Sequence, residues 1–332
     1  MSRLPITIAT WDYDRVRALT DGRVRVEGCD VNYLTMPVEE CFERAFFHGE
    51  FEVAEIGFSP YLIALSRATR ATVPYVAVPV FLSRMFRHSA VYIRTDRGIA
   101  GPADLRGKTV GVPEYQMSAV LWFRGLLQDE FGITAKDINW VQAGLENPGR
   151  REKFPLNLPG DFPLTSRSDR SLSQLLIDGE IDGILSARRP SCFVDRHPKV
   201  ARLFPDYRAA ERDYFRKSGI FPIMHALGIR RDIYENHRWL AASLYKAFLQ
   251  AKRIADAEFT ETTALKVGLP WVNAEYEDTA ALMGDDFWSY GIAPNRKTLS
   301  TMARYSYEQG LSVRLLTVEE MFAEGNLTET RV

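Results

Sequence analysis

The sequence predicts an α/β protein of two lobes with a helical C-terminal region. Strand-like and helix-like segments alternate from the N-terminus, and a second unit of the same style begins near Pro102. From Arg230 onward the segments are helical. Repeated strand–helix units form parallel sheets that helices cover. The 332 residues are enough for two domains, since one domain takes roughly 150 residues.

The first unit shows its elements in order. Apolar residues alternate with other residues from Leu4 to Ile8, as in a strand, and a short helix is expected to follow as far as Gly22. Pro37 opens a longer helix that ends at Gly49, and the acidic residues in its first turn stabilise its positive end. The other strands expected here cover residues 31–34, 53–56, 75–82 and 89–94.

The second unit starts with a strand over residues 108–112. The next helix has apolar residues at helical spacing from Ala119 to Phe131 and ends at Gly132. The polar segment 144–171 is too long for a simple connection, so we expect an excursion over the surface that could act as a lid. The remaining elements expected are a helical turn at 102–107, strands at 138–141 and 181–185, a helix at 172–179, and C-terminal helices at 240–254, 275–290, 296–309 and 318–323.

Composition excludes several classes of protein. The 42 basic and 43 acidic residues give a formal net charge of −1, whereas nucleic-acid-binding proteins carry a basic excess. A hydrophobic content of 46% excludes a disordered chain. The longest uncharged stretch, residues 71–83, has thirteen residues, and a membrane-spanning helix needs about 20 apolar residues.

Cysteine usage and the N-terminus indicate a compartment. Cys29, Cys41 and Cys192 are odd in number and have no CxxC spacing, which argues against a disulfide framework and fits a reducing compartment. The N-terminus lacks the apolar core of a secretory signal. With Met1 as the first residue, we expect a cytoplasmic protein.

The expected strand ends select the candidate site. In parallel α/β sheets, ligands bind in the crevice beyond the carboxyl ends of the strands. Four segments follow expected strands, namely 11–14, 55–61, 114–118 and 186–190.

Motifs in these segments resemble those of a known family. The run DLRGKTVGVP at 104–113 resembles the start of the second lobe in type II periplasmic binding proteins. Narrower motifs are WDYDR at 11–15, Ala54-Glu55, FRHS at 86–89, EYQMSA at 114–119, Trp122, Arg124-Gly125, ARRP at 187–190 and FPIMH at 221–225. Together they span nearly the whole chain and resemble the 4,5-dihydroxyphthalate decarboxylase family.

This resemblance implies a type II periplasmic-binding-protein-like fold with two crossover strands, adapted to a cytoplasmic enzyme. Lobe I would comprise residues 1–92 together with 227–332, and lobe II residues 93–226. The chain would cross near Val91 and near Ala226. The implied reaction removes CO2 from 4,5-dihydroxyphthalate and leaves 3,4-dihydroxybenzoate.

Such a reaction needs a proton donor near the ring carbon that loses CO2, and histidine meets this need at neutral pH. His48, His197 and His237 lie in polar contexts and are expected at the surface. His88 and His225 are the catalytic candidates, because each lies in an apolar setting beside an expected crossover. The alternative for each is a core histidine hydrogen-bonded to the backbone.

Glu55 is the third catalytic candidate. A carboxylate at a buried strand end costs free energy unless it is paired or used. Glu55 could accept a catechol proton or orient a histidine, and capping of the following helix is equally open. Ser59 could share either role.

Arginines are the candidates for binding a dianionic substrate. Arg188 and Arg189 end a strand at the expected crevice, and the planar guanidinium matches a carboxylate. Neighbours on an extended chain face opposite ways, so we expect one to bind ligand and the other to pair with a surface acid. Arg84 and Arg87 are further candidates, which a solvated loop explains as well.

A helix N-terminus and an aromatic ring complete the expected substrate site. Tyr115, Gln116 and Ser118 would lie where free amides and the helix dipole favour a carboxylate, with ordinary N-capping by Ser118 as the alternative. Trp11 could stack on the substrate ring or simply pack, and Asp12 lies beside it at the same strand end.

Glu55, His88 and His225 could form a facial metal site if the fold brings them together. No HxH or HExxH pair is present, and we expect no required metal or cofactor. The sequence has no GxGxxG after a strand and no P-loop, which argues against a dinucleotide or ATP. A GxSxG nucleophile motif is also missing.

Three functions therefore compete: a decarboxylase of 4,5-dihydroxyphthalate, a lyase of another hydroxybenzoate, and a binding module that captures an aromatic or anionic molecule without chemistry. The missing export signal and the paired histidines disfavour the binding module. The expected partner is a small aromatic acid, with no nucleic acid and no membrane. The helical tail leaves a homo-oligomer open.

Overall fold

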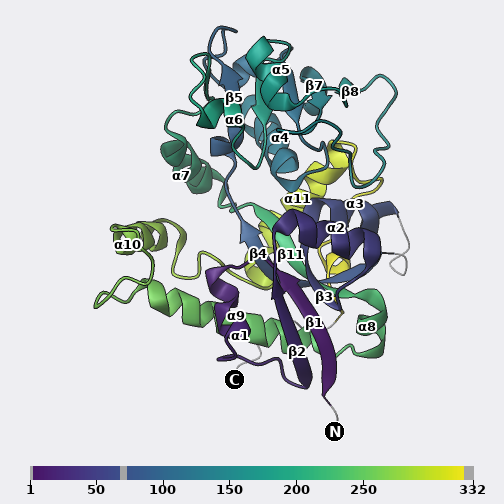
Figure 1. The fold of residues 1–332 in the computed structure, drawn as a ribbon, viewed down its shortest axis with the longest axis vertical. Coiled ribbons are helices and arrows are strands. Elements are labelled where there is room, and N and C mark those ends of the chain that lie inside the picture. Colours follow the sequence, from purple (N-terminus) through teal and green to yellow (C-terminus); the bar gives the residue numbers. More distant parts are fainter. Residues whose placement is uncertain (1–2, 68–72, 325–332) are drawn as a thin grey trace.

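The computed structural model describes residues 3–67 and 73–324, which form two lobes, each built on a β-sheet (Figure 1). Met1, on which the expected cytoplasmic location partly rests, lies outside these residues. The α/β class and the two-lobed fold predicted from the sequence are confirmed.

The first sheet has five strands in the order β2-β1-β3-β11-β4. They are β1 (Leu4–Thr10), β2 (Cys29–Thr35), β3 (Val53–Gly57), β4 (Tyr75–Arg84) and β11 (Ile223–Arg230). β1 runs parallel to β2 and β3, whereas β11 is inserted antiparallel between β3 and β4. The carboxyl ends of β1 and β3 therefore meet at one edge of the sheet, where the start of β11 joins them.

The second sheet has six strands in the order β10-β5-β9-β6-β7-β8. They are β5 (Val91–Arg94), β6 (Thr109–Val112), β7 (Asn139–Gln142), β8 (Leu164–Ser166), β9 (Gly183–Leu185) and β10 (Val200–Arg202). The four neighbouring strands β9, β6, β7 and β8 are parallel, with β8 at the edge, and β5 runs antiparallel to β9 and β10.

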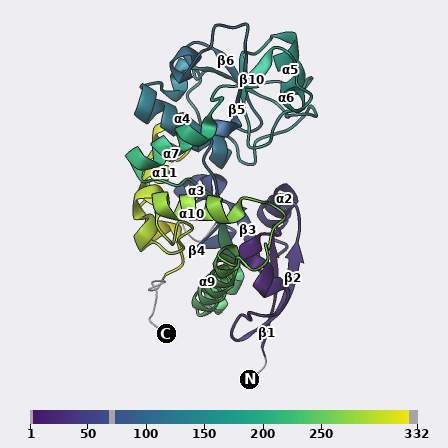
Figure 2. The ribbon, with the colours of Figure 1, turned by 90° about the vertical axis from the view of Figure 1, so that its left-hand side faces the viewer.

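Helices cover both sheets (Figures 1 and 2). Those packed around the first sheet and in the C-terminal region are α1 (Arg17–Thr20), α2 (Val38–His48), α3 (Phe58–Arg67), α8 (Arg231–Asn236), α9 (Leu240–Phe259), α10 (Val272–Met283) and α11 (Arg296–Glu308). Those of the second lobe are α4 (Ser118–Phe131), α5 (Leu172–Asp178), α6 (Ser191–Val194) and α7 (Tyr207–Ser218).

The chain passes between the two sheets through residues 85–90, which join β4 to β5, and through residues 219–222, which join α7 to β11. Ala226, expected near a crossover, lies inside β11 and pairs with Ile56 of the first sheet. The division of the chain into lobes at residues 92/93 and 226/227 stays a prediction.

Helices α4 and α11 join the lobes at a close contact. Tyr305 of α11 lies so near Gly125 of α4 that a Cβ at Gly125 would fall 2.1 Å from the tyrosine ring. The Tyr305 hydroxyl donates to Asp129 at 2.6 Å, and Arg124 donates to Gln309 at 2.7 Å. One apolar core consequently continues from the first lobe into the second.

Some predicted elements differ from the observed ones. The helix expected at 275–290 is α10, which ends at Met283 because Gly284 follows with φ of 87°. The expected helix at 318–323 is a single 3₁₀ turn, Glu319–Met321. The polar segment 144–171 contains the short strand β8 and no helix.

Two further findings concern the expected compartment and membrane. Cys29, Cys41 and Cys192 are all buried and unpaired. Across the described residues, no helix is both long enough and apolar enough to span a bilayer.

Candidate active site

A carboxylate, an imidazole and a phenol meet at the end of β3. Glu55 is fully buried, and its Oε1 accepts hydrogen bonds from the Tyr13 hydroxyl and from His225 Nδ1, both at 2.7 Å. Its Oε2 accepts the backbone N–H of Trp11 at 2.9 Å. Both carboxylate oxygens are thus engaged, and these contacts correspond to the histidine-orienting alternative rather than to helix capping.

The first sheet brings these groups together. Ala9 of β1 pairs with Ala54 of β3, so the chain leaving β1 passes beside Glu55. His225 lies at the start of β11 and pairs with Gly57 in antiparallel register. The three partners of Glu55 therefore come from two segments that are far apart in sequence: residues 11–13, which follow β1, and the start of β11.

The hydrogen bonds settle the charge of this cluster. Burial alone would raise the pKa of Glu55, but the hydrogen bond and charge of His225, with the Trp11 amide and the Tyr13 hydroxyl, lower it. Burial and the neighbouring carboxylate raise the pKa of Tyr13, so its hydroxyl keeps its proton. An ionised Glu55 can only accept, so Nδ1 of His225 carries a proton.

The other nitrogen of His225 is available to a ligand. His225 Nε2 has no hydrogen-bond partner in the described part of the chain, and the side chain is 17% exposed. The ring of Phe42 packs against the imidazole at 4.8 Å between centroids, in edge geometry. Glu55 and Phe42 together hold the ring orientation, which leaves Nε2 free for proton transfer.

His88 lies in a different environment. Its ring packs against Phe204 and Tyr214 at centroid distances of 5.0 and 5.5 Å. Its Nδ1 is buried and has no partner among the described residues. Burial lowers the pKa of His88 to about 4, so the ring is neutral at pH 7. No hydrogen bond joins His88 to the Glu55 cluster, and a catalytic role for it stays a prediction.

Arg87 is a buried cation without an anionic partner. Its side chain is 8% exposed, and its guanidinium donates to the thioether sulfurs of Met224 at 3.3 Å and Met85 at 3.5 Å. Thioethers are weak acceptors, and no described carboxylate lies within ion-pair distance of Arg87. Burial lowers its pKa to about 10, while Glu211 and Tyr13 act on it from longer range. Arg87 could therefore bind a substrate carboxylate.

The start of α4 is occupied by the protein itself. The backbone N–H groups of Tyr115 and Gln116 both donate to the carboxylate of Glu152, and Gln116 Nε2 donates to it at 2.7 Å. The amides expected to bind a substrate carboxylate thus already face a carboxylate of the polar segment.

Ser118 does not act as the N-cap of α4, because that position belongs to Met117. Its hydroxyl instead donates to the carbonyl of Met224 at 3.0 Å and accepts the N–H of Ser59 at 3.1 Å. It therefore bonds α4 of the second lobe to α3 and β11. The Ser59 hydroxyl is buried and has no partner within the described residues.

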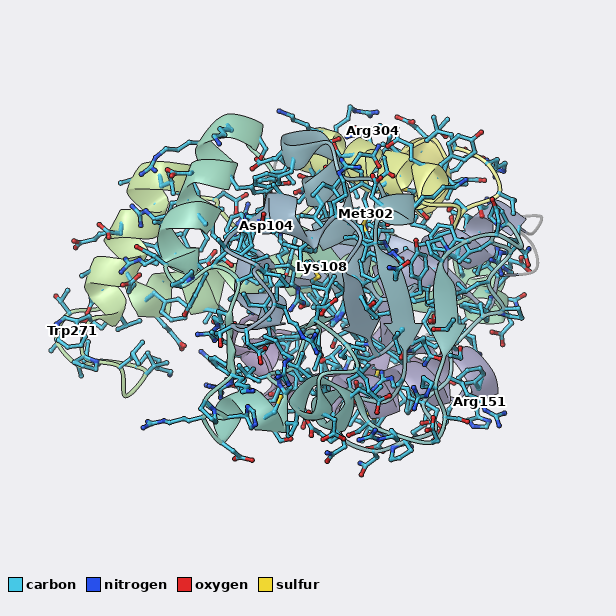
Figure 3. The ribbon with its side chains drawn as sticks, turned by 90° about the horizontal axis from the view of Figure 1, so that it is seen from above. Asp104, Lys108, Arg151, Trp271, Met302 and Arg304 are labelled. Atoms are coloured by element: carbon cyan, nitrogen blue, oxygen red, sulfur yellow. The ribbon has the colours of Figure 1, made fainter. Side chains whose placement is uncertain are left out.

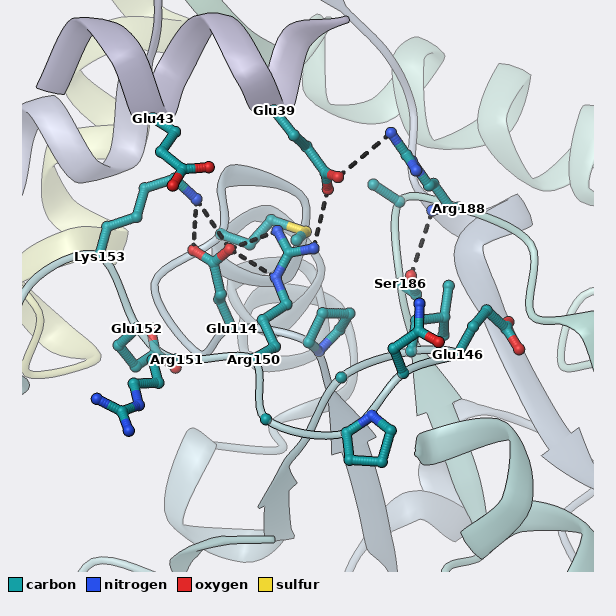
Figure 4. A pocket seen from close by; sticks show the side chains of 18 of the residues that line it. Glu39, Glu43, Glu114, Glu146, Arg150, Arg151, Glu152, Lys153, Ser186 and Arg188 are labelled. Atoms are coloured by element: carbon teal, nitrogen blue, oxygen red, sulfur yellow. Dashed lines mark hydrogen bonds and ion pairs between the residues drawn. The ribbon is translucent and has the colours of Figure 1, made fainter. Parts of the chain in front are cut away.

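A cavity of about 690 Å³ lies between α2 and the loops of the second lobe (Figure 4). Glu114 is buried at its wall and receives Arg150 Nε at 2.9 Å and Lys153 Nζ at 2.7 Å. Arg150 also reaches Glu39 of α2 at 3.0 Å. The polar segment thus forms ion pairs on both sides of the cavity.

Arg188 also reaches Glu39, at 3.3 Å, from the end of β9 (Figure 4). Arg189 is exposed and forms no ion pair with any described residue. Trp11 is 44% exposed at the end of β1, and the exposed Asp12 lies 3.5 Å from Arg17. Substrate contacts by these four residues stay predictions.

Arg84 is bound by backbone groups. It donates to the carbonyl of Phe221 at 2.7 Å and to that of Ser289 at 3.2 Å. These contacts place it at the second crossover, away from the Glu55 hydrogen-bond network.

The structure brings together only part of the facial metal set expected from the sequence. Glu55 and His225 are in contact, whereas His88 shares no hydrogen bond with them. Among the described residues, no group of three or more His, Cys, Asp or Glu side chains is arranged to hold a metal ion.

Sequence reasoning missed several groups of this site. Tyr13 lies in the WDYDR motif, and its position at a strand end could have singled it out. Glu114 follows β6, where the same strand-end rule applies. Arg150, Glu152 and Lys153 lie in the polar segment, whose charges look like an ordinary solvated surface.

The fold is similar to that of solved solute-binding proteins. The periplasmic aliphatic sulphonate binding protein of Escherichia coli superposes with a TM-score of 0.53 at 14% identity, covering 97% of this chain and 98% of that one. A putative periplasmic sulfonate-binding protein of Methylobacillus flagellatus gives a TM-score of 0.51 at 17% identity, with 97% and 92% covered. The protein thus has the two-lobed periplasmic-binding-protein fold.

The sequence comparison is more specific. The chain is 43% identical over 333 residues to 4,5-dihydroxyphthalate decarboxylase of Comamonas testosteroni, with 100% of both chains covered. It is 43% identical over 217 residues to the enzyme of that name from Pseudomonas putida, which covers 65% of this chain and 83% of that one. The chain belongs to the 4,5-dihydroxyphthalate decarboxylase family. No family model matches it.

Proposed function

We propose that this protein is a carboxy-lyase that removes CO2 from 4,5-dihydroxyphthalate and releases 3,4-dihydroxybenzoate. The observation that carries the proposal is the Glu55–His225 hydrogen bond of 2.7 Å, in a chain that matches a named decarboxylase over its full length. The unpaired cysteines support a reducing compartment, the cytoplasm.

The chemistry follows from the substituents of the ring. The ring carbon that bears the leaving carboxylate takes a proton, while the hydroxyl para to it gives up its own proton and supplies electrons. The C–C bond then breaks, its electron pair restores the aromatic ring, CO2 leaves and the phenol regains a proton. In balance, the dianion and one proton give the monoanionic product and CO2, so no free aryl anion forms.

His225 is the group best placed to deliver the proton. Its Nδ1 is held by Glu55, and its Nε2 has no partner in the described structure. A positioned acid of this kind contributes about 10²–10⁴ in rate. Glu55 acts through His225 as a positioning residue, and Tyr13 holds Glu55 in turn.

The carboxylate that the ring retains needs a cation. Arg87 is buried and lacks an anionic partner among the described residues. It contacts Met224, which lies next to His225 in β11. A charge-assisted bond from its guanidinium to the carboxylate would satisfy both groups. Arg188 lines the cavity between α2 and the second lobe. It could attract the substrate dianion by giving up its exposed ion pair with Glu39 and pairing with a substrate carboxylate instead.

The experiment is CO2 release by the purified protein from 4,5-dihydroxyphthalate and from phthalate. We expect release from the first and much less from the second, because phthalate lacks the hydroxyl that supplies electrons. Equal release from both would contradict the mechanism. Tight binding of 4,5-dihydroxyphthalate with no CO2 would identify a binding protein, and release from other hydroxybenzoates alone would move the assignment to a related lyase.

A further inference from the structure

A second cavity is lined by residues of α7 and α10. Its volume is about 340 Å³, and its lining includes Met85 and Phe86 of the first crossover and Phe221 of the second. Arg151, at the first cavity, and Trp271, beside α10, project from opposite sides of the molecule (Figure 3). The linings of the two cavities share no residue, so they are separate sites.

Aromatic rings form the wall of this second cavity. Phe86 and Phe221 lie 4.8 Å apart between ring centroids, and Phe221 meets Trp288 at 5.4 Å in edge geometry. Phe287 adds a fourth ring to the lining. These rings are only partly buried, so they offer faces and edges to a flat apolar ligand.

Charged residues of both signs line this cavity, namely Arg84, Arg208, Arg212, Glu211 and Glu275. Burial raises the pKa of Glu211 to about 7, and the buried cation of the wall is Arg84. Its side chain is 6% exposed, and its guanidinium lies 4.8 Å from the centre of the Phe221 ring. Its Nε is buried without a hydrogen-bond partner in the described chain, and no described carboxylate lies within ion-pair distance. Asp286 acts on it only from longer range, and burial lowers its pKa to about 9.

The neighbouring arginines are already paired. Arg208 binds Glu275 at 2.9 Å, and Arg212 reaches Asp278 at 3.7 Å, so both bridge α7 to α10 at the rim. Arg84 is the cation of this cavity that lacks a counter-charge among the described residues. A buried, unpaired cation is costly, and a ligand carboxylate would offset that cost.

From these contacts we propose that the cavity between α7 and α10 is a second binding site, separate from the Glu55–His225 site, for an aromatic monocarboxylate whose carboxylate faces Arg84. A cavity of about 150 Å³ accepts benzene, so 340 Å³ has room for a ring with a carboxylate and hydroxyls. A single carboxylate matches the single unpaired cation. Because both crossovers line the site, its ligand contacts the two connections between the lobes.

The test is the binding stoichiometry of 3,4-dihydroxybenzoate, measured by calorimetry on the whole protein without turnover. Leu282 of α10 lines the cavity, and Leu282→Trp would fill it. The matched control is Ala281→Trp, at the neighbouring exposed position of the same helix, which does not line the cavity. We expect Leu282→Trp to lose one equivalent of ligand relative to both the wild type and the control.

Two probes then identify the chemistry. Benzoate should fill the site in the wild type and fail to do so in Leu282→Trp, whereas catechol, which lacks a carboxylate, should not fill it in either protein. Unchanged stoichiometry in a folded Leu282→Trp, or catechol binding equal to benzoate binding, would overturn the proposal. If the proposed decarboxylation were wrong, ligand binding at the Glu55–His225 site or CO2 release would be absent. The difference in stoichiometry between the wild type and Leu282→Trp would remain.

Discussion

Glu55 and Glu114 occupy similar places in the two lobes, but their partners differ. Each lies near the carboxyl end of a buried parallel strand, β3 in the first sheet and β6 in the second, and each is almost wholly buried. Glu55 binds a hydroxyl, a backbone amide and the imidazole of His225. Glu114 binds the basic side chains of Arg150 and Lys153.

This difference separates a structural carboxylate from one suited to catalysis. Arg150 and Lys153 both belong to the polar segment, so their ion pairs with Glu114 fix that segment at the cavity. Glu55 faces an imidazole, the side chain that gains and loses a proton near neutral pH. Burial at a strand end therefore does not identify a catalytic carboxylate, whereas the partner of that carboxylate does.

The largest effect is expected on turnover when the Glu55–His225 pair is broken. His225→Asn should lower kcat about 10²–10⁴-fold, because the proton donor is lost. Glu55→Gln should lower kcat less, because the imidazole keeps Nε2 but loses the carboxylate that orients it. CO2 release under saturating substrate measures both.

The matched control is Glu114→Gln, which removes a buried carboxylate from the other lobe. We expect it to keep most of the wild-type kcat. If Glu114→Gln lowered kcat as much as Glu55→Gln in folded proteins, the distinction between the two carboxylates would fail.

Glu114→Gln should affect the free energy of unfolding strongly, in contrast to its small expected effect on kcat. Glu114→Gln leaves Arg150 and Lys153 without their shared anion, and we expect a loss of about 2–3 kcal/mol in the free energy of unfolding, since breaking a buried pair costs several kcal/mol and these cations are partly exposed. Urea unfolding measures it. Glu43 lines the same cavity and forms no ion pair with a described residue. Glu43→Gln should therefore lower the free energy of unfolding by under about 0.5 kcal/mol. Similar losses in both variants would argue against the pairing.

Arg87 offers a comparison with both carboxylates, because it is a buried cation for which residues 3–67 and 73–324 supply no ion-pair partner. Arg87→Met should raise KM for 4,5-dihydroxyphthalate about 10- to 100-fold, the worth of a charge-assisted hydrogen bond, with a smaller effect on kcat. Arg87→Lys should recover part of the loss, because the charge returns without the planar fork. An unchanged KM in Arg87→Met would remove Arg87 from the substrate site.

Glu211 is a third carboxylate, and among the residues that the structure describes it has neither a cation at ion-pair distance nor an imidazole partner. Burial raises its pKa to about 7, although the N–H of Ser89 and the charges of Arg87 and Arg202 oppose this. The folded state therefore holds its proton more tightly than the unfolded state. Its contribution to stability is fully present below about pH 4.5 and is lost as the pH rises through 7.

We accordingly expect Glu211→Gln to be more stable than the wild type at pH 8 by about 1–2 kcal/mol, a figure reduced for partial exposure, and to show little difference at pH 5. Thermal unfolding at the two pH values measures it. A difference that did not grow with pH would contradict the assigned burial of the charge.

Local patterns in the sequence predicted most of the architecture and part of the site. The alternation in β1 was readable because Ile6 and Ile8 are buried and their neighbours Pro5 and Thr7 are not. Helix α4 was readable from its apolar spacing and its end at Gly132, although ten of its fourteen residues are buried. Helix α3 was expected only as the helix that follows Glu55, without bounds, and eight of its ten residues are buried, so few polar positions mark its exposed face. Strand β11, which carries His225, was also missed. Its pairing between β3 and β4 joins segments far apart in sequence, and no local pattern of residues indicates such a pairing.

His88 and His225 illustrate why the rest of the site could not be predicted from the sequence. His88 and His225 both lie in apolar motifs near crossovers, so their sequences look alike. Only the register of β11 against β3 brings one of them to Glu55. The charges of the polar segment likewise appear solvated in sequence, whereas Arg150 and Lys153 fold back onto Glu114.

The central claim, that His225 protonates the ring while Glu55 positions it, is tested most directly by hydrogen exchange into the product. The same acid should protonate ring carbon 6 of 3,4-dihydroxybenzoate, with the hydroxyl para to it supplying electrons, and loss of the original hydrogen then restores the aromatic ring. In D2O this exchanges the hydrogen at position 6 for deuterium, which NMR detects without any need for CO2. We predict that the wild type and Glu114→Gln catalyse this exchange, that Glu55→Gln does so slowly, and that His225→Asn does not. Exchange at the wild-type rate in His225→Asn would contradict the account.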